Sequence, residues 1–443
     1  MTPGLGWIGI VRLGLVQTAL GAVVVLTTST LNRVMVVELA LPAVLPGALV
    51  ALHYAVQMLR PRLGYGTDRS GRATPWIVGG MAVLAAGGAL AAVATAWMAT
   101  APLAGLLLAV AAFLLIGGGV GAAGTSLLVL LAKRVDERRR AAAATIVWVM
   151  MIFGFVVTAT SAGHLLEPFS HARLVAVTGG VSVVAFVLAL LAVWGVERGA
   201  GPAPARPAAA PVREALRQGW TEPVARRFTV FVFVSMLAYS AQDLILEPFA
   251  GLVFGLTPGA TTRLAGVQHG GVLTGMVLVA LAGSAIPGRR LGSLRAWTVG
   301  GCLASAVALC GLVGAGLAGP GWPLQPTVFA LGLANGAFAV AAIGSMMGLA
   351  GQGRQAREGV RMGLWGAAQA IAFGLGGFLG AAAVDVARLL VGSPVTAYGT
   401  VFAAQAALFV LAAMLAARVG EAAAPRISIT AVGAVNAAGL GGR

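Results

Sequence analysis

The chain has 443 residues, of which 59% are hydrophobic and only 9% are charged. Soluble domains carry about 25% charged residues, so most of this chain is excluded from water. Apolar runs of about 20 residues or more recur along the chain, and each is long enough to cross the hydrocarbon core as a helix. A membrane β-barrel would show alternating segments of about ten residues instead. The composition therefore predicts an all-α integral membrane protein.

Twelve transmembrane helices are predicted, and in chain order they lie near residues 7–30, 39–61, 74–98, 102–131, 142–166, 173–195, 226–248, 263–286, 294–318, 325–351, 359–391 and 396–418. The segment from Gly199 to Pro207 is rich in Pro and Gly, which is typical of a linker. We therefore expect one six-helix half at residues 1–195 and a second at 226–420. A cytoplasmic linker at 196–225 would join them, and residues 421–443 would form a disordered tail. Paired six-helix halves are a transporter architecture.

The formal charge of +16 is explained by topology. With these helix boundaries, all but four of the 29 basic residues fall on one side of the membrane, and the exceptions are Arg33, Arg173, Arg263 and Arg388. Positively charged loops remain in the cytoplasm. The distribution therefore favours an even number of helices with both termini in the cytoplasm, and it indicates no nucleic-acid partner.

The loop after the second predicted helix reads Gly64-Tyr-Gly-Thr-Asp68-Arg69-Ser-Gly71-Arg72. It resembles the cytoplasmic signature of the major facilitator superfamily, Gly-x-x-x-Asp-Arg-x-Gly-Arg. Gly64 would let two helices cross closely, and Gly71 permits a tight turn. Asp68 can pair with arginines or cap a helix end. We expect this segment to form a conformational latch at the cytoplasmic mouth.

Four ionisable residues near helix ends form the second candidate site. Asp243 and Glu247 lie four residues apart, and therefore on one face of the seventh predicted helix. Ionisable residues inside membranes are costly and usually functional, so this pair is a candidate proton or cation site. Alternatively, the pair forms a structural ion pair with Arg33 across the two halves. Glu38 is the other acidic residue near this predicted membrane surface.

Four longer segments are similar to the PucC family, which includes LhaA and is a major facilitator branch from phototrophic bacteria. These segments are Leu31–Ala43, Leu59–Asp68, Gln242–Gly255 and Arg361–Ala370. The resemblance runs from about Gly6 to Arg418. It implies a major facilitator fold in the bacterial inner (intracytoplasmic) membrane. It also implies a role in assembling light-harvesting complexes, by binding bacteriochlorophyll or its intermediates or by delivering them to antenna polypeptides.

The resemblance implies partners and a ligand as well. Light-harvesting polypeptides or enzymes of bacteriochlorophyll biosynthesis would be partners, together with the lipid bilayer. No cofactor is required, and bacteriochlorophyll is the candidate ligand. His53 and His269 are the deepest imidazoles, so they are candidate contacts to the pigment magnesium. Packing between helices is the alternative role for both. No metal site of the protein's own is expected.

Two other functions remain open on the sequence alone. One is a secondary transporter that couples an amphipathic solute to protons through Asp243 or Glu247. The other is a static scaffold that gathers pigment-synthesis enzymes. An enzyme is not expected, because the chain has no Walker-type loop, no nucleophile elbow and too few carboxylates for a prenyl-diphosphate site.

Overall fold

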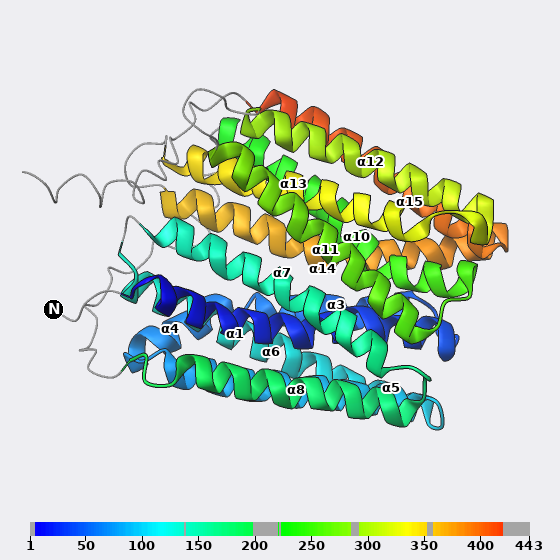
Figure 1. Ribbon diagram of the computed structural model, residues 1–443, viewed down its shortest axis with the longest axis horizontal. Helices are drawn as coiled ribbons and strands as arrows, with labels where there is room; N and C mark the ends of the chain where they lie inside the picture. The colour runs from blue at the N-terminus through cyan, green and yellow to red at the C-terminus, as the bar shows by residue number, and fades with distance from the viewer. Residues whose placement is uncertain are drawn as a thin grey trace, which may run out of the picture.

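The computed structural model describes residues 5–136, 139–197, 220, 223–284, 292–351 and 358–419. These residues form a bundle of long helices joined by short loops (Figure 1). The first half contains α1 (Trp7–Val25), η1 (Leu26–Thr30), α2 (Leu31–Arg33), η2 (Val34–Glu38), α3 (Val44–Gln57), α4 (Arg60–Ser70), α5 (Thr74–Met98), α6 (Pro102–Arg134), α7 (Arg140–Leu165) and α8 (His171–Val193). The second half contains α10 (Pro223–Phe254), α11 (Pro258–Ser284), α12 (Leu294–Ala318), η4 (Gly319–Gly321), α13 (Leu324–Gly351), α14 (Glu358–Val391) and α15 (Pro394–Arg418).

Within the described residues, 11 helices are long and apolar enough to cross a membrane. The shorter apolar helix α3 (Val44–Gln57) occupies the place of the second predicted span. The prediction that the first span ends near residue 30 is wrong, because the helix continues without interruption to Glu38. It ends where Ala40 adopts a φ of 51° and Pro42 lacks a backbone donor.

Helix packing repeats in the two halves. In the first half α1 packs on α7 and α8, and in the second half α10 packs on α14 and α15. The contact of α3 with α6 in the first half corresponds to that of α11 with α13 in the second. The contact of α5 with α8 corresponds in the same way to that of α12 with α15. Each half buries its own large hydrophobic cluster, and Leu244 is the residue of the second half that joins the first cluster. The bundle is therefore of the major facilitator type, with two pseudo-symmetric six-helix halves. Most of the predicted linker and all of the predicted tail lie outside the described residues.

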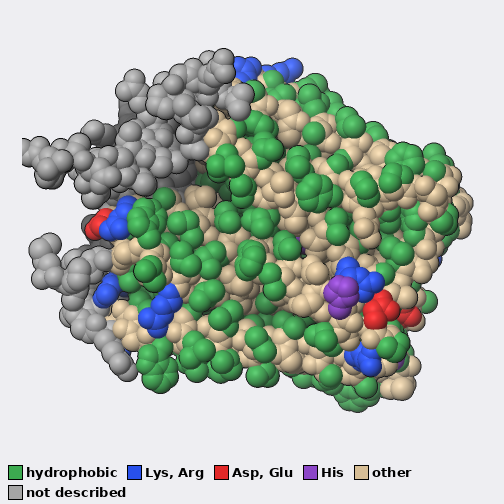
Figure 2. Space-filling view, in the orientation of Figure 1, with side chains coloured by type: hydrophobic (Ala, Val, Ile, Leu, Met, Phe, Trp, Pro, Cys, Tyr) green, Lys and Arg blue, Asp and Glu red, His purple; other side chains and the backbone are tan. Residues whose placement is uncertain are grey.

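Helix α1 begins, and helix α15 ends, at the same end of the bundle (Figure 1). We call this the basic end, because most of the described lysines and arginines lie there, chiefly in the terminal turns of helices. We call the opposite end, where the first transmembrane helix is followed by α3, the distal end. On the face shown in Figure 2, hydrophobic side chains cover the middle of the bundle and charged side chains lie toward its two ends. This distribution is that of a multi-pass membrane protein.

The halves meet along two helix pairs, α7 with α11 and α3 with α14. The first transmembrane helix joins this interface unevenly. Its segment at residues 26–38 contacts α10 and α11, whereas the principal contacts of residues 7–25 stay within the first half. The first transmembrane helix therefore joins the interface between the halves chiefly through its distal part.

Candidate functional site

The distal interface between the halves is polar. We call it the central seam and define it as residues 26–38 of the first transmembrane helix together with the facing residues 242–262 of α10 and α11. The Ser29 hydroxyl donates to the Glu247 carboxylate, and the Thr30 and Thr262 hydroxyls lie 3.0 Å apart. The Asn32 amide donates to the carbonyl of Leu244 at 2.6 Å. Three residues within about one helical turn of the first half thus bind the second half.

Two π-helical turns shape this segment, η1 at Leu26–Thr30 and η2 at Val34–Glu38. In an α-helix, side chains five residues apart do not face each other. The π turn closes hydrogen bonds from residue i to residue i+5, so it brings Arg33 and Glu38 onto one face. Arg33 donates to Glu38 through Nη1 and to the carbonyl of Leu256 through Nη2 at 2.6 Å. Isolated π turns inside α-helices are frequent at functional sites.

Arg33 is 2% exposed, although the sequence placed it in a loop at the outer surface. Its guanidinium lies across Gly251, where an added Cβ would come within 3.0 Å of Nη2 and 3.2 Å of Nε. The Nε atom has no hydrogen-bond partner. The cation is therefore inside the protein, held by one carboxylate and one carbonyl of opposite halves.

The predicted ion pair of Arg33 with Asp243 or Glu247 is not formed. Arg33 pairs with Glu38, and Arg263 lies 3.6 Å from Glu167. In the described part of the chain, Asp243 and Glu247 have no basic partner within ion-pair distance.

Instead, neutral groups surround the two carboxyls. Ser29 donates to Glu247, and Gln268 lies beside Asp243. Among the described residues, the Oδ1 atom of Asp243 and the Oε2 atom of Glu247 are buried and have no hydrogen-bond partner. Unpartnered buried polar atoms are costly and rare, so they mark this seam as a functional candidate.

Sequence reasoning missed several residues of the seam. Ser29, Thr30 and Thr262 supply cross-half hydrogen bonds but were not singled out. The run Thr27-Thr-Ser-Thr30 inside an otherwise apolar helix was the available signal, because hydroxyl groups hydrogen-bond between membrane helices.

An aromatic cluster continues the interface toward the basic end. Tyr54 of the first half and Tyr239 of the second both pack against Phe373, each with a ring-centroid distance of 5.8 Å.

Two more contacts tie the distal ends of the halves together. The Asp385 carboxylate accepts from the backbone N–H of Ala43 at 3.0 Å and of Val44 at 2.7 Å, at the start of α3. The Thr257 hydroxyl donates to Glu167 at 2.6 Å. The hydrogen bonds between the described parts of the two halves therefore lie in the distal part of the bundle.

His53 is 1% exposed and hydrogen-bonded within its own half. Arg60 donates to the Oε1 atom of Gln57, which turns the Gln57 amide nitrogen toward His53 Nε2 at 2.8 Å. An amide nitrogen can only donate, so Nε2 accepts and the ring proton is on Nδ1. Neither nitrogen then has a lone pair for a magnesium ion, and the geometry is that of a packed histidine.

His269 is arranged differently. Its Nδ1 lies 2.8 Å from the carbonyl oxygen of Ala265, so this nitrogen carries the proton and the Nε2 lone pair is not used. The ring is half-buried and meets Phe155 edge-on at 4.8 Å, at the contact between the halves. The Nε2 lone pair of His269 is therefore available to coordinate a metal ion or to accept a hydrogen bond from a ligand. The described residues contain no cluster of three or more His, Cys, Asp or Glu side chains suited to a metal ion.

The predicted latch is only partly described. Gly71 has a φ of 73°, in the left-handed region that favours glycine, so the expected tight turn is present. Arg72 lies close enough to Glu197 to influence its charge. The side chains of Asp68 and Arg69, and the surroundings of Gly64, lie outside the described residues.

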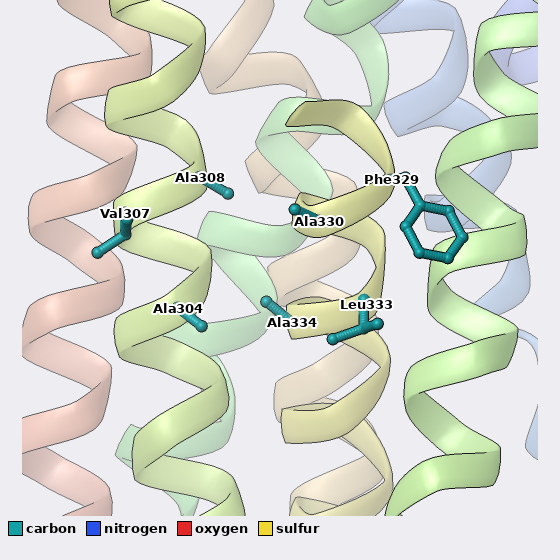
Figure 3. Close-up of a pocket in the computed structure, with 7 residues that line it drawn as sticks. All are labelled: Ala304, Val307, Ala308, Phe329, Ala330, Leu333 and Ala334. Atoms are coloured by element: carbon teal, nitrogen blue, oxygen red, sulfur yellow. The ribbon is translucent and has the colours of Figure 1, made fainter. Parts of the chain in front are cut away.

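Two apolar hollows open on the outside of the bundle. The first, of about 500 Å³, is a groove between α7 and α8 with α1 as its floor. Figure 1 shows α1 between these two helices. The second, of about 540 Å³, is a short depression between α12 and α13. In Figure 3, Val307 and Phe329 flank this depression and four alanines lie between them.

The arrangement of the helices in two packed halves is the fold of major facilitator transporters. It is similar to a crystal structure of the peptide transporter POT in complex with sulfate, with a TM-score of 0.70 at 14% identity, covering 95% of this chain and 97% of that one. At such low identity the likeness shows the fold alone.

The family follows from the sequence comparison. The PUCC protein family profile matches residues 30–424, so the chain belongs to the PucC family. It is 56% identical over 412 residues to the "bacteriochlorophyll synthase 44.5 kDa chain" of Rhodobacter capsulatus, covering 93% of this chain and 95% of that one. It is also 28% identical to "protein PucC" of Cereibacter sphaeroides, covering 83% of this chain and 81% of that one.

Proposed function

We propose that this protein assists the assembly of light-harvesting complexes by binding bacteriochlorophyll, or one of its intermediates, in the photosynthetic inner membrane. It passes the pigment to antenna polypeptides or to enzymes of the pigment pathway. Membership of the PucC family over residues 30–424 carries the proposal. The name of the 56% identical relative supports bacteriochlorophyll as the ligand.

The geometry suits a binding protein better than an enzyme. The two described hollows are apolar and open on the outside of the bundle, where a hydrophobic molecule arrives through the lipid. The carboxyls of Asp243 and Glu247 lie in the seam between the halves, and the described residues place no third His, Cys, Asp or Glu with them to hold a metal ion. The synthase label of the relative is therefore not carried over to this chain.

Gentle purification from a phototrophic host tests the proposal. The absorption spectrum of the purified protein should show bacteriochlorophyll or an intermediate, and mass spectrometry should identify antenna polypeptides or pathway enzymes beside it. An unrelated major facilitator protein from the same membranes is the control for adhering pigment. Partner polypeptides without pigment would favour the scaffold function. The absence of both pigment and partner polypeptides from the purified protein would overturn the proposal.

A proton-coupled transporter is the second candidate, and one observation favours it. Asp243 and Glu247 both carry an unpartnered buried oxygen at the contact between two halves of a transporter fold. Asp243→Asn should then abolish proton-linked uptake while the protein stays folded. Asp136→Asn is the control, because Asp136 is exposed and pairs with Arg139 at the basic end. Normal antenna assembly by a folded Asp243→Asn variant would remove this candidate.

A further inference from the structure

We propose that the groove between α7 and α8 binds the isoprenoid tail of the pigment, as one hydrocarbon chain that lies parallel to the helices. This inference rests on the proposed function and adds to it the part of the ligand that the protein recognises. The walls of the groove are residues 153–165 of α7 and 176–188 of α8, and its floor is Thr18, Ala19 and Ala22 of α1.

The dimensions of the groove select a single chain. Each wall covers 12 residue steps, so the groove is about 18 Å long at about 1.5 Å per residue. This length is roughly half of the ~30 Å hydrocarbon core, that is, about one leaflet. A volume of about 500 Å³ over that length gives a cross-section of roughly 30 Å². A helix about 10 Å in diameter needs roughly 80 Å², so an antenna helix could lie over the groove but not inside it.

The lining explains why a tail binds here and not a polar head. No charged side chain lines the groove, and its hydroxyl groups belong to Thr18, Thr158 and Ser161. Thr18 donates to the carbonyl of Met150 at 2.9 Å, and Ser161 donates to the carbonyl of Val157 at 2.7 Å. The hydroxyls of Thr18 and Ser161 are thus already bonded to the backbone, so the surface offered to a ligand is chiefly hydrocarbon.

The walls also favour a branched chain over a straight one. Bulky side chains such as Val157 and Val184 are interrupted by small residues such as Ala176 and Gly180. An added Cβ at Gly180 would have no neighbour within 4 Å, so a recess opens at this residue. The methyl branches of an isoprenoid fill such recesses, whereas a straight acyl chain leaves them empty.

The pigment head then lies at the distal mouth of the groove. Leu165 of α7 and Ala176 of α8 line that end, close to the start of α8 at His171. His164 directly precedes Leu165, and its side chain is exposed. An imidazole at the membrane surface is a suitable donor for a chlorin magnesium. The tail is thus buried along the bundle while the head stays accessible to a receiving polypeptide.

Two matched pairs of variants test this inference in nanodiscs loaded with purified bacteriochlorophyll. Gly180→Leu fills the groove, whereas Gly179→Leu places the same side chain on a neighbouring residue that is equally open but does not line it. Val184→Trp and Val183→Trp repeat the comparison at exposed residues of α8, of which only Val184 lines the groove. Melting temperature and gel filtration establish that each variant is folded.

The pigment-to-protein ratio should fall at least fivefold in Gly180→Leu and Val184→Trp and stay at the wild-type value in both controls. Bacteriochlorophyllide, which lacks the tail, should bind weakly to all five proteins. Geranylgeraniol should displace the pigment from wild type, and a straight-chain alcohol with as many carbon atoms should not. Equal displacement by both alcohols would assign the groove to acyl chains and overturn the isoprenoid inference.

Two further outcomes separate this inference from the proposed function. If wild type and both groove variants retain pigment equally, the tail does not occupy the groove, although the protein still binds pigment. If wild type itself retains no pigment above an empty nanodisc, the proposed function fails and this inference fails with it.

Discussion

The guanidinium of Arg33 occupies the space beside Gly251 that a side chain at residue 251 would need, with Nη2 3.0 Å and Nε 3.2 Å from the position of an added Cβ. Gly251→Ala should therefore displace Arg33 and weaken its bonds to Glu38 and Leu256. Overpacking of this kind costs about 1–3 kcal/mol. Thermal unfolding in detergent measures the effect. Gly270→Ala, on α11 with open space at its Cβ, should leave the melting temperature unchanged.

Ser29→Ala should destabilise the seam, because it removes the Ser29 donor to the Glu247 carboxylate, whose other oxygen already lacks a hydrogen-bond partner among the described residues. An unsatisfied buried acceptor costs about 1–3 kcal/mol. Thr28→Ala is the matched control, since the Thr28 hydroxyl bonds only within its own helix, to the carbonyl of Val24 at 2.9 Å. Similar melting temperatures for the two variants would show that the bond between the halves contributes nothing.

Asp385→Ala should loosen the distal closure, because one carboxylate holds two backbone donors at the start of α3 in the other half. Loss of such a helix cap costs about 0.5–2 kcal/mol. Asp385→Asn keeps one acceptor and should have a smaller effect. Spin labels on the α5–α6 connection and on the connection between α12 and α13 would report the separation of the distal ends. An unchanged distance distribution in the alanine variant would contradict a closing role.

The end of α8 is fixed to the start of α5 in a pH-dependent way. Glu197 accepts from the backbone N–H of Ala73 and of Thr74, each at 2.8 Å. Partial burial opposes ionisation, but these donors, the Thr74 side chain and the nearby Arg72 charge outweigh it, so the pKa of Glu197 is lowered from its usual 4.5.

Because the folded-state pKa is the lower one, this attachment contributes fully above pH 4.5 and is lost as the pH falls through the depressed value. Glu197→Gln should reduce the melting temperature at neutral pH and flatten its dependence on acid below about pH 5. Melting curves of both proteins across that range measure the difference. Parallel acid profiles would assign the dependence to other groups.

Reporter fusions test the topology. Fusions at Ala200 and in the C-terminal tail should report the cytoplasm, and a fusion in the loop from Gly319 to Gln325 should report the outside. The structure places the start of α1 and the end of α15 at one end of the bundle, so the two terminal reporters should agree. Disagreement between them would contradict an even number of crossings.

The sequence predicted the fold closely because the bilayer restricts the choice of structure. Long apolar runs had to be helices, and the loop arginines fixed their alternating direction. Asp243 and Glu247 were also singled out from the sequence, and one oxygen of each carboxyl is buried at the contact between the halves. Their partners were not, because a hydrogen bond between Ser29 and Glu247 depends on the packing of residues 218 positions apart.

Arg33 was misplaced for a different reason. The first span was expected to end near residue 30, which left Arg33 in a loop, whereas the helix continues through the two π turns to Glu38 and keeps Arg33 inside it. The groove between α7 and α8 was also beyond prediction, since it depends on how far two neighbouring helices diverge over α1. The latch role of Asp68 and Arg69 stays a prediction, because their side chains lie outside the described residues.

The two π turns also affect how relatives of this protein should be compared. A π turn takes up about one residue more than an α turn, which rotates everything after it by about 100° around the axis. A relative that lacks one of the turns would be one residue shorter between residues 26 and 38 and yet keep an intact transmembrane helix. A single-residue gap there is therefore acceptable in an alignment. Moving it into the loop after Glu38 would pair lipid-facing residues of one protein with seam residues of the other.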